Sequence, residues 1–551
     1  MVDTDKKIFP AEVSMPDKLK TFDEKLEAGT ELRIYNITDH IKVLIGEGGR
    51  AEVFGRELPI NEPVFFHQGE KFAIYCWRPT RITICGQVEC DPSNNTPMHI
   101  YVNIQCALNQ LRLSALNEKR IGPNLLVTGS HLSGKSTLCR MLVNYAIKQG
   151  WTPVLADIDL QSSEISPLGT ISASLISEST VLPSDSHSKN TLSYFHGNTH
   201  IITDDFFNKQ VIELADAVKL KLENDLNQFK GQFQLETVPA DEDLKEVQQL
   251  VRPVFPQLFA SGCIINGFTP DGRQTDTLIN AIEKFEVDVV LVIDNERLEK
   301  SLTQKLLNRK QGQKPIKVIK VPKSSGVDNT KGELSEVLFN EYRDYFRGKH
   351  YEVFSKNQQN REELGLVEQA VRNELDPQPI NLPVDKIKIF EVKGSEIPLS
   401  LLPAHCTEPE KITLVEPILP QDLEKGMADY KHRILSVLVP KEIAVMKQLE
   451  QRIAQNQGDE TLKEEFRNCL MRSCTTEFLQ IKDFKPDSKT QKKTLEVVRT
   501  CANKEKPQAK NAAEAGEPGQ GATGESVDSG LGGLASSYFM ISKFNLKKNV
   551  F

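Results

Sequence analysis

The chain has 551 residues, which is enough for about two to four domains that each bury a core. Its formal net charge of −8 gives no general attraction for nucleic acid, so an RNA site would have to be a local basic groove. No apolar run reaches the ~20 residues that span a bilayer, and residues 1–7 lack the apolar segment of a secretory signal. We therefore expect a cytosolic or nuclear protein without membrane contact, whose ten cysteines are reduced structural thiols.

The first part of the chain, from residue 20 to about residue 104, is predicted to be a small all-β domain. Short segments of alternating apolar and polar residues are separated by Gly, Asn and Pro, and they cover residues 31–35, 41–45, 51–54 and 81–84. From Tyr101 to Glu118 the apolar period becomes helical. We place the first domain boundary between residues 104 and 105.

The central part begins with a complete Walker A phosphate loop, which follows an apolar strand-like run at 125–127 and precedes a helix-like run at 138–146. Its glycines let backbone N–H groups surround a phosphate at a helix N-terminus. Lys135 would neutralise the β- and γ-phosphate charge, and the Ser136 hydroxyl would complete a Mg²⁺ shell. The sequence therefore predicts a nucleotide site formed by Gly129, Ser130, His131, Leu132, Ser133, Gly134, Lys135, Ser136 and Thr137.

Buried strands alternate with helix-length segments from residue 121 to about residue 348, which predicts a parallel sheet with helices on both faces. The expected strands cover residues 154–158, 262–266, 287–293 and 316–321. A charged stretch at about 219–246 is predicted to be a helical excursion with a solvated face. We assign residues 105–348 to this central domain.

Two carboxylates follow predicted strands and could serve the phosphate loop. Asp159 follows the second strand, and Asp294 follows the strand at 289–293, so both would reach the carboxyl edge of the sheet. We favour Asp159 as general base or Mg²⁺ organiser and interpret Asp294 as a helix N-cap. Lys323 is either a base-side contact or a solvated lysine. The segment 341–347 is either a lid helix or a surface helix that packs its aromatic residues.

The last part, residues 349–551, returns to strand-like segments at 387–392, 412–415 and 434–439. The stretch from about 440 to 537 is charged and then rich in Gly, Ala and Glu. We predict a long insertion there, with a helix near 442–455 followed by disorder. A final strand is expected at 538–542.

The motifs at 129–137, Asp159 with 167–170, 261–266, 285–298 and 322–327 come in an order that resembles the Clp-one family. Its members are polynucleotide 5′-hydroxyl kinases and kinase-like subunits of the pre-mRNA cleavage and polyadenylation machinery. The segments 30–33, 51–58 and 96–98 are similar to the family's N-terminal domain. The resemblance implies an α/β fold: a central P-loop kinase-like parallel sheet between an N-terminal β-sandwich and a C-terminal mixed α/β domain. It further implies that ATP is held by Glu31 and Lys71 near its base. Independently of the resemblance, Ser136 of the phosphate loop and Asp159 after the second strand are the residues expected to hold Mg²⁺.

Three departures from the family pattern concern phosphoryl transfer. Leu132 stands where active members carry an Asp, and Pro270 stands where they carry an RNA-clasping Trp, leaving Phe268 nearby to stack a base. Of the two lid arginines, Arg343 is kept and Glu341 replaces the other. A carboxylate beside a transferring phosphoryl group opposes its developing charge. The combination predicts a site that keeps ATP and has lost transfer.

We therefore expect an ATP-binding subunit of a nuclear pre-mRNA 3′-end processing complex, in which ATP has a mainly structural role. The expected partner is the large scaffold subunit of the cleavage factor, with other 3′-end processing factors and RNA as further candidates. The alternative is an active kinase that phosphorylates 5′-hydroxyl RNA ends, with Asp159 as base and Arg343 on the phosphates. A ribosomal-RNA-processing kinase of the same superfamily is a third interpretation.

Overall fold

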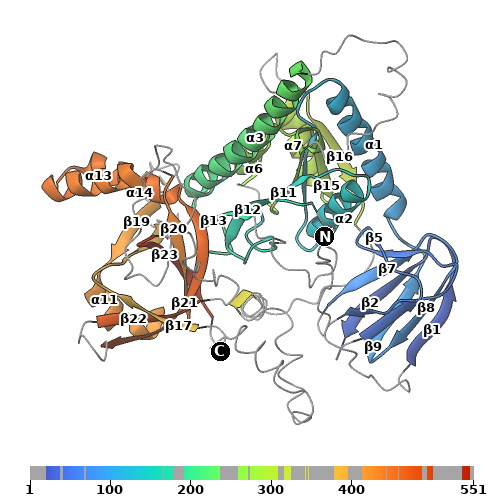
Figure 1. Ribbon diagram of the computed structural model, residues 1–551, viewed down its shortest axis with the longest axis horizontal. Coiled ribbons are helices and arrows are strands. Elements are labelled where there is room, and N and C mark those ends of the chain that lie inside the picture. The colour runs from blue at the N-terminus through green and yellow to red at the C-terminus, as the bar shows by residue number, and fades with distance from the viewer. Residues whose placement is uncertain are drawn as a thin grey trace, which may run out of the picture.

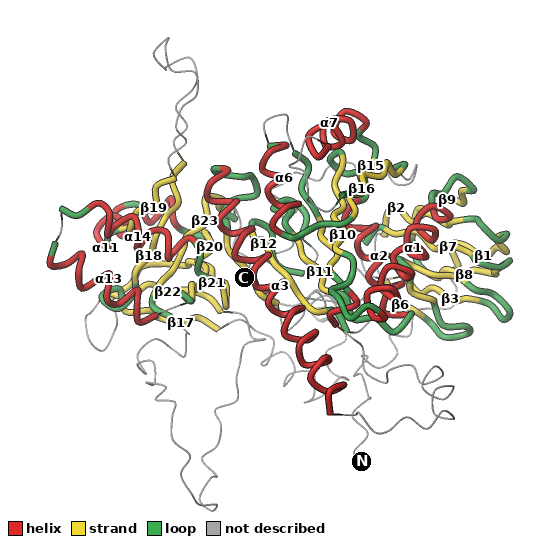
Figure 2. The backbone as a smooth tube through the Cα atoms, turned by 90° about the horizontal axis from the view of Figure 1, so that it is seen from above, coloured by secondary structure: helices red, strands yellow, loops and turns green. Residues whose placement is uncertain are grey.

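The computed structural model describes residues 20–37, 41–66, 70–163, 165–177, 191–235, 258–270, 274–307, 315–323, 342, 345–346, 378–394, 413–441, 443–456, 458–486, 493–499 and 536–546. The described parts form an elongated molecule, with β-rich regions at its two ends and an α/β region between them (Figures 1 and 2). In this part of the chain no helix is long and apolar enough to cross a membrane. The described cysteines are free thiols.

The N-terminal end is a β-sandwich of two antiparallel sheets. Alternating burial along its strands, as in Ile41–Ile45, sends every second side chain into the core between the sheets. One sheet has the order β1-β8-β3-β6 and the other β5-β4-β7-β2-β9. The strands are β1 Lys20–Leu26, β2 Glu31–Ile37, β3 Ile41–Ile45, β4 Ala51–Val53, β5 Arg56–Glu57, β6 Val64–Phe66, β7 Phe72–Cys76, β8 Thr80–Cys85 and β9 Val88–Ser93.

The central region carries the predicted parallel sheet, in the order β16-β15-β10-β14-β11. Four of its strands, β10, β11, β14 and β15, are buried on both faces, whereas the edge strand β16 is largely exposed. The helices α1 and α2 pack with one apolar cluster, and α3 and α6 pack with the other. The strands are β10 Asn124–Gly129, β11 Val154–Asp157, β14 Cys263–Asn266, β15 Val289–Ile293 and β16 Lys317–Val321. The helices are α1 Met98–Asn117, α2 Lys135–Lys148, α3 Asp204–Leu235, α5 Leu258–Ser261, α6 Thr275–Lys284 and α7 Glu296–Leu307.

Within the described residues, the central sheet continues into the C-terminal region as one sheet of 14 strands. After β11 the order runs β12-β13-β21-β20-β23-β18-β19, and β12 and β13 pair antiparallel. Strand β22 pairs with both β21 and β17. The strands are β12 Thr170–Leu175, β13 Thr191–Phe195, β17 Gln378–Pro383, β18 Lys388–Gly394, β19 Thr413–Ile418, β20 Arg433–Val439, β21 Cys474–Pro486, β22 Lys493–Arg499 and β23 Tyr538–Asn545. The helices are α11 Pro420–Lys425, α12 Met427–Tyr430, α13 Ile443–Gln455 and α14 Glu460–Met471.

The stretch from about 440 to 537 differs from the insertion that we expected. The predicted helix is present as α13, but α14 follows it, and β21 and β22 then join the C-terminal sheet. Leu479, Ile481 and Val497 of these strands are buried in the core of this sheet. The expected disorder falls largely at 500–535, outside the described residues. The domain boundaries at 104/105 and 348/349 remain predictions.

The aromatic residues of the expected lid segment lie in the protein core. Tyr342 and Phe346 are fully buried in an apolar cluster with the C-terminal strands, and the Tyr342 hydroxyl donates a hydrogen bond to the Leu168 carbonyl at 2.9 Å. These aromatics therefore pack between the central and C-terminal regions. Arg343 and Glu341 lie outside the described residues.

Candidate nucleotide site

The phosphate loop joins the carboxyl end of β10 to the start of α2. Two of its positions use the conformational freedom of glycine. Gly129 lies so close to β15 that an added Cβ would be 2.3 Å from the Ile293 carbonyl oxygen, and Gly134 has a φ of 90° at the N-cap of α2. Leu132 between them has a φ of 54°, which is uncommon for a branched residue. The loop therefore has the tight turn and close backbone approach that phosphate binding requires.

Lys135 and Asp159 lie side by side in this site. The Lys135 Nζ is 3.5 Å from an Asp159 carboxylate oxygen and donates a hydrogen bond to the Thr269 hydroxyl at 2.8 Å. Both charged residues are buried, with about 5% of their surface exposed. Burial raises the pKa of the Asp159 carboxyl above its usual range, although the charges of Lys135 and His131 oppose the rise. The residue we favoured as base or Mg²⁺ organiser therefore meets the phosphate loop.

A second carboxylate, Asp157, lies at the end of β11 and was not expected to take part. Asn266 at the end of β14 connects it to the loop, because the Asn266 Nδ2 donates both to Asp157 at 3.2 Å and to the Ser136 hydroxyl at 3.1 Å. Burial and the neighbouring Asp159 charge raise the pKa of Asp157 well above its usual range. Since β11 and β14 are adjacent parallel strands, their carboxyl ends converge beside Ser136.

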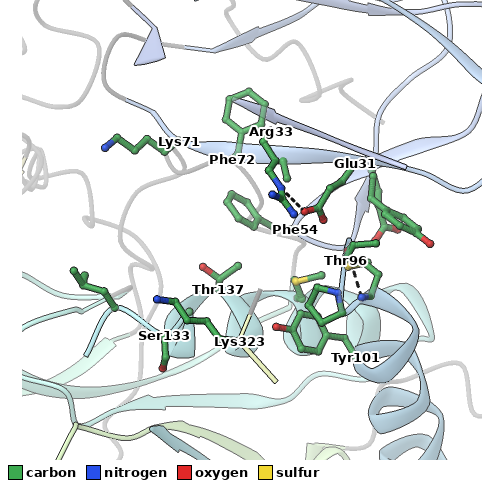
Figure 3. A pocket seen from close by; sticks show the side chains of 18 residues that line it. Glu31, Arg33, Phe54, Lys71, Phe72, Thr96, Tyr101, Ser133, Thr137 and Lys323 are labelled. Carbon is green, nitrogen blue, oxygen red and sulfur yellow. Dashed lines mark hydrogen bonds and ion pairs between the residues drawn. The ribbon is translucent and has the colours of Figure 1, made fainter. Parts of the chain in front are cut away.

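Across from the loop, the β-sandwich contributes a buried ion pair. The Arg33 Nε is 2.7 Å from a Glu31 carboxylate oxygen, and a second guanidinium nitrogen of Arg33 donates to the Asn95 carbonyl at 2.6 Å. Both side chains are less than a tenth exposed, which is unusual for charged residues. Lys71 is exposed and lies apart from Glu31, beyond Arg33 and Phe72 (Figure 3). Arg33, which the sequence analysis does not single out, thus holds Glu31 in place.

One pocket brings the two sides together (Figure 3). Its wall includes Glu31 and Lys71 from the sandwich, the loop residues 132–134 with Thr137, and Lys323 after β16. The remaining wall comes from residues that carry no local sequence signal. Three of them are polar, Arg33, Glu52 and Thr96, and the others are apolar or aromatic, namely Phe54, Phe72, Ala73, Tyr75, Pro97, Met98, Tyr101 and Met141. A phosphate-binding end joined to an apolar aromatic end is typical of a nucleotide site.

Two interpretations of individual residues are wrong. Phe268 does not offer a surface for stacking a base, since it is 5% exposed and packs edge-to-face on Phe207 with ring centroids 5.3 Å apart. Asp294 is not the N-cap of α7, because the side chain of Asn295 accepts the hydrogen bond from the Leu298 N–H at 2.9 Å.

The chemistry of the pocket fits a nucleoside triphosphate. The Ser133 hydroxyl is 3% exposed, lies in the loop, and has no hydrogen-bond partner among the described residues, so a phosphate oxygen would satisfy it. Within the described ranges, no group of three His, Cys, Asp or Glu residues could hold a metal ion. Mg²⁺ at such sites takes one or two protein oxygens with phosphates and waters, so Ser136 with Asp159 or Asp157 would suffice.

Two parts of the sequence match families of protein domains. Residues 25–115 match the family described as the N-terminal beta-sandwich domain of polyadenylation factor, and residues 129–235 and 239–348 match mRNA cleavage and polyadenylation factor CLP1 P-loop. Proteins named polyribonucleotide 5′-hydroxyl-kinase Clp1 are 29% identical over 420 residues in Xenopus tropicalis and over 426 residues in Homo sapiens. These alignments cover 75% and 76% of this chain and 81% and 85% of the two relatives.

Two solved structures are similar in fold. One is a wild-type Clp1p–Pcf11p complex, with a TM-score of 0.59 at 18% identity over 95% of this chain and 97% of that chain. The other describes an extended interface between Pcf11p and Clp1p, with a TM-score of 0.60 at 17% identity over 95% of this chain and 98% of that chain. At these identities the likeness establishes the fold.

Proposed function

The chain belongs to the family of the mRNA cleavage and polyadenylation factor Clp1, the Clp-one family of the sequence analysis, and from this premise we propose that it is an ATP-binding subunit of a nuclear pre-mRNA 3′-end processing complex. One observation carries the proposal: the phosphate loop and the buried Glu31 of the sandwich line the same pocket. Ser133 in the pocket wall and Lys135, two residues further along the loop, would contact the phosphates, and Phe54 and Tyr101 would cover apolar parts of the nucleotide.

In this proposal ATP has a mainly structural role. A ligand that touches both the sandwich and the loop stabilises their mutual orientation, and its binding free energy adds to the stability of the folded state. Loss of transfer is supported by Leu132, which points an apolar side chain, 39% exposed, at the pocket from inside the phosphate loop. It is also supported by the burial of Phe268, which removes the aromatic residue nearest to Pro270 from any contact with an RNA base.

The alternative is an active polynucleotide 5′-hydroxyl kinase, and one observation favours it. Asp159 lies beside Lys135, and its pKa is raised by burial, as a general base requires. Proteins named as such kinases are among the relatives of this chain. In this alternative Asp159 would accept the proton of the attacking hydroxyl, Mg²⁺ on Ser136 would offset phosphate charge, and Arg343 would be the lid residue.

We propose the large scaffold subunit of the cleavage factor as the direct partner, because both structural neighbours contain Pcf11p bound to a Clp1p chain. Other 3′-end processing factors and RNA are proposed as further partners, and the nucleus as the location, since pre-mRNA 3′ ends are formed there.

The first test of the proposal is nucleotide retention. Purified full-length protein is denatured, and the released nucleotide is quantified by ion-exchange chromatography, with Lys135→Ala as the comparison. We expect ATP at close to one molecule per chain in the wild type and little in the variant, which lacks the charge that faces the phosphates. Wild-type protein that neither retains nor binds added ATP would contradict the proposal.

A further inference from the structure

The sandwich is attached to the helix that follows the phosphate loop. The turn between β4 and β5 sits on α2, where Gly55 has a φ of 85° and an added Cβ would be 3.1 Å from the Met141 carbonyl oxygen. The Asn144 Nδ2 donates a hydrogen bond to the Phe54 carbonyl at 2.8 Å, and the Arg140 guanidinium lies 4.9 Å from the centroid of the Phe54 ring. Phe54 is therefore held from α2 while it lines the nucleotide pocket.

A buried carboxylate lies at the centre of this contact. Glu52 on β4 is 1% exposed, and each of its oxygens accepts one hydrogen bond. The donors are the Trp77 Nε1 of the sandwich, at 2.7 Å, and the Tyr145 hydroxyl of α2. A buried carboxylate needs such donors, because leaving it without them carries the full cost of its desolvation. Tyr145 of α2 thus donates one of the two hydrogen bonds that stabilise the buried Glu52 carboxylate of the sandwich.

Tyr145 cannot reach the nucleotide itself. It lies ten residues beyond Lys135 on α2, which at 1.5 Å per residue is about 15 Å along the helix, and it does not line the pocket. An ion pair between α2 and the sandwich joins Lys148 to Glu57 at 3.2 Å, and both side chains are more than a third exposed. Exposed pairs of this kind contribute little. The buried contacts of Tyr145 and Asn144 therefore carry the attachment.

We propose that Tyr145, through its hydrogen bond to Glu52, is a positioning residue that holds the sandwich over the phosphate loop and so forms the complete nucleotide pocket before ATP binds. This inference rests on the proposed function. It adds that the two halves of the site are joined by the protein as well as by the nucleotide. Because the sandwich is already in place, its contacts add to the affinity for ATP, and no free energy is spent on ordering the two domains when ATP binds.

The test compares two ligands that both bind the phosphate loop but differ in whether they also contact the sandwich. Mg²⁺-ATP contacts the loop and the sandwich side of the pocket, whereas Mg²⁺-tripolyphosphate contacts the loop alone. Their affinities are measured on the full chain by displacement of a fluorescent ATP analogue, for wild type and for Tyr145→Phe, which keeps the ring and removes the hydroxyl. We expect the variant to lose about tenfold in ATP affinity, within the usual range for coupled sites, while its tripolyphosphate affinity stays within about twofold of wild type.

A matched control separates positioning from general destabilisation. Tyr538 on β23 forms the same kind of hydrogen bond, to Glu450 of α13, in the C-terminal region far from the pocket (Figure 1). Tyr538→Phe should leave both affinities unchanged. If Tyr145→Phe fails to fold, Asn144→Ala, which removes the hydrogen bond to Phe54, is measured in its place with the same expectation.

Each outcome has one meaning. Equal losses of ATP and tripolyphosphate affinity, or no loss of either in a folded Tyr145→Phe protein, overturn the positioning role and leave the proposed function intact. A loss of ATP affinity in Tyr538→Phe as large as in Tyr145→Phe also overturns it. Wild-type protein that binds no ATP is instead a failure of the proposed function.

Discussion

His196 ties the stability of the sheet to pH. This fully buried residue directly follows β13, and its Nε2 accepts a hydrogen bond from the Ile202 N–H at 3.0 Å. Its Nδ1 therefore carries the proton and donates to the Gln210 Oε1 at 2.9 Å. The ring stacks on Phe206 with centroids 4.7 Å apart. Burial lowers the pKa of His196 from 6.5 to about 4, so the folded protein holds a neutral imidazole.

The sign and size of the effect follow from this shift. Below pH 6.5 the unfolded chain binds a proton at this residue, whereas the folded chain does so only near pH 4. The contribution of His196 to stability is therefore present above pH 6.5 and is lost as the pH falls. Between pH 7 and pH 5 the loss amounts to about 2 kcal/mol.

Urea unfolding of wild type and His196→Gln at pH 7 and pH 5 measures this contribution. Glutamine offers an oxygen close to the place of the Nε2 acceptor and does not titrate, so it lowers stability at both pH values without adding a pH dependence. Carboxylates titrate alike in both proteins and cancel in the comparison. We expect the wild type to lose about 2 kcal/mol more than the variant between the two pH values. Equal losses in the two proteins would refute the reasoning.

Three further substitutions test the site and its surroundings. Gly129→Ala would place a Cβ 2.3 Å from the Ile293 carbonyl oxygen, so calorimetry should find no ATP binding in a folded variant, and wild-type affinity would speak against the loop geometry. Arg33→Met leaves the buried Glu31 carboxylate without its ion pair and should cost about 3–5 kcal/mol in urea unfolding; a loss under about 1 kcal/mol would disagree. Arg112 is 1% exposed, its Nη1 has no hydrogen-bond partner among the described residues, and burial lowers its pKa to about 10. Arg112→Met removes this costly buried charge but also the Nε hydrogen bond to the Ser261 carbonyl, so the melting temperature should stay unchanged or rise, and a large drop would count against this.

The phosphate loop could be predicted because its signal is local. The glycines, Lys135 and Ser136 lie within one short segment, and the flanking strand and helix are readable from their apolar patterns. The position of Asp159 at the site could also be predicted, since the carboxyl ends of parallel strands converge at one edge of a sheet. Asp157 was missed because a carboxylate inside a strand-like run reads as part of the strand, and only the register of β11 beside β14 brings it to Asn266.

The other half of the pocket could not be read from local patterns. Glu31 and Lys71 were identified only through resemblance, and Arg33, Phe54 and Tyr101 join them through the docking of the sandwich on α2. This docking depends on contacts between residues about 90 positions apart, such as Asn144 with Phe54. No periodicity within one segment reports such contacts.

The C-terminal strands β21 and β22 could not be predicted from the sequence for a different reason. Runs such as 478–481 and 495–498 have strand composition, but charged helices precede them and a Gly- and Ala-rich stretch follows, so the whole interval was assigned to one insertion. Phe268 was assigned a stacking role because an aromatic residue after a strand resembles a base platform. Its burial against Phe207 depends on the position of α3, which the sequence pattern does not reveal.

The most direct test of the central claim is transfer of labelled γ-phosphate from ATP to a 5′-hydroxyl RNA oligonucleotide by the purified full-length protein, with Lys135→Ala as the blank. The account predicts no transfer above the blank from wild-type protein that still contains ATP. Transfer that is abolished by Lys135→Ala would contradict it, and would show that Leu132, Pro270 and Glu341 leave the site able to phosphorylate RNA.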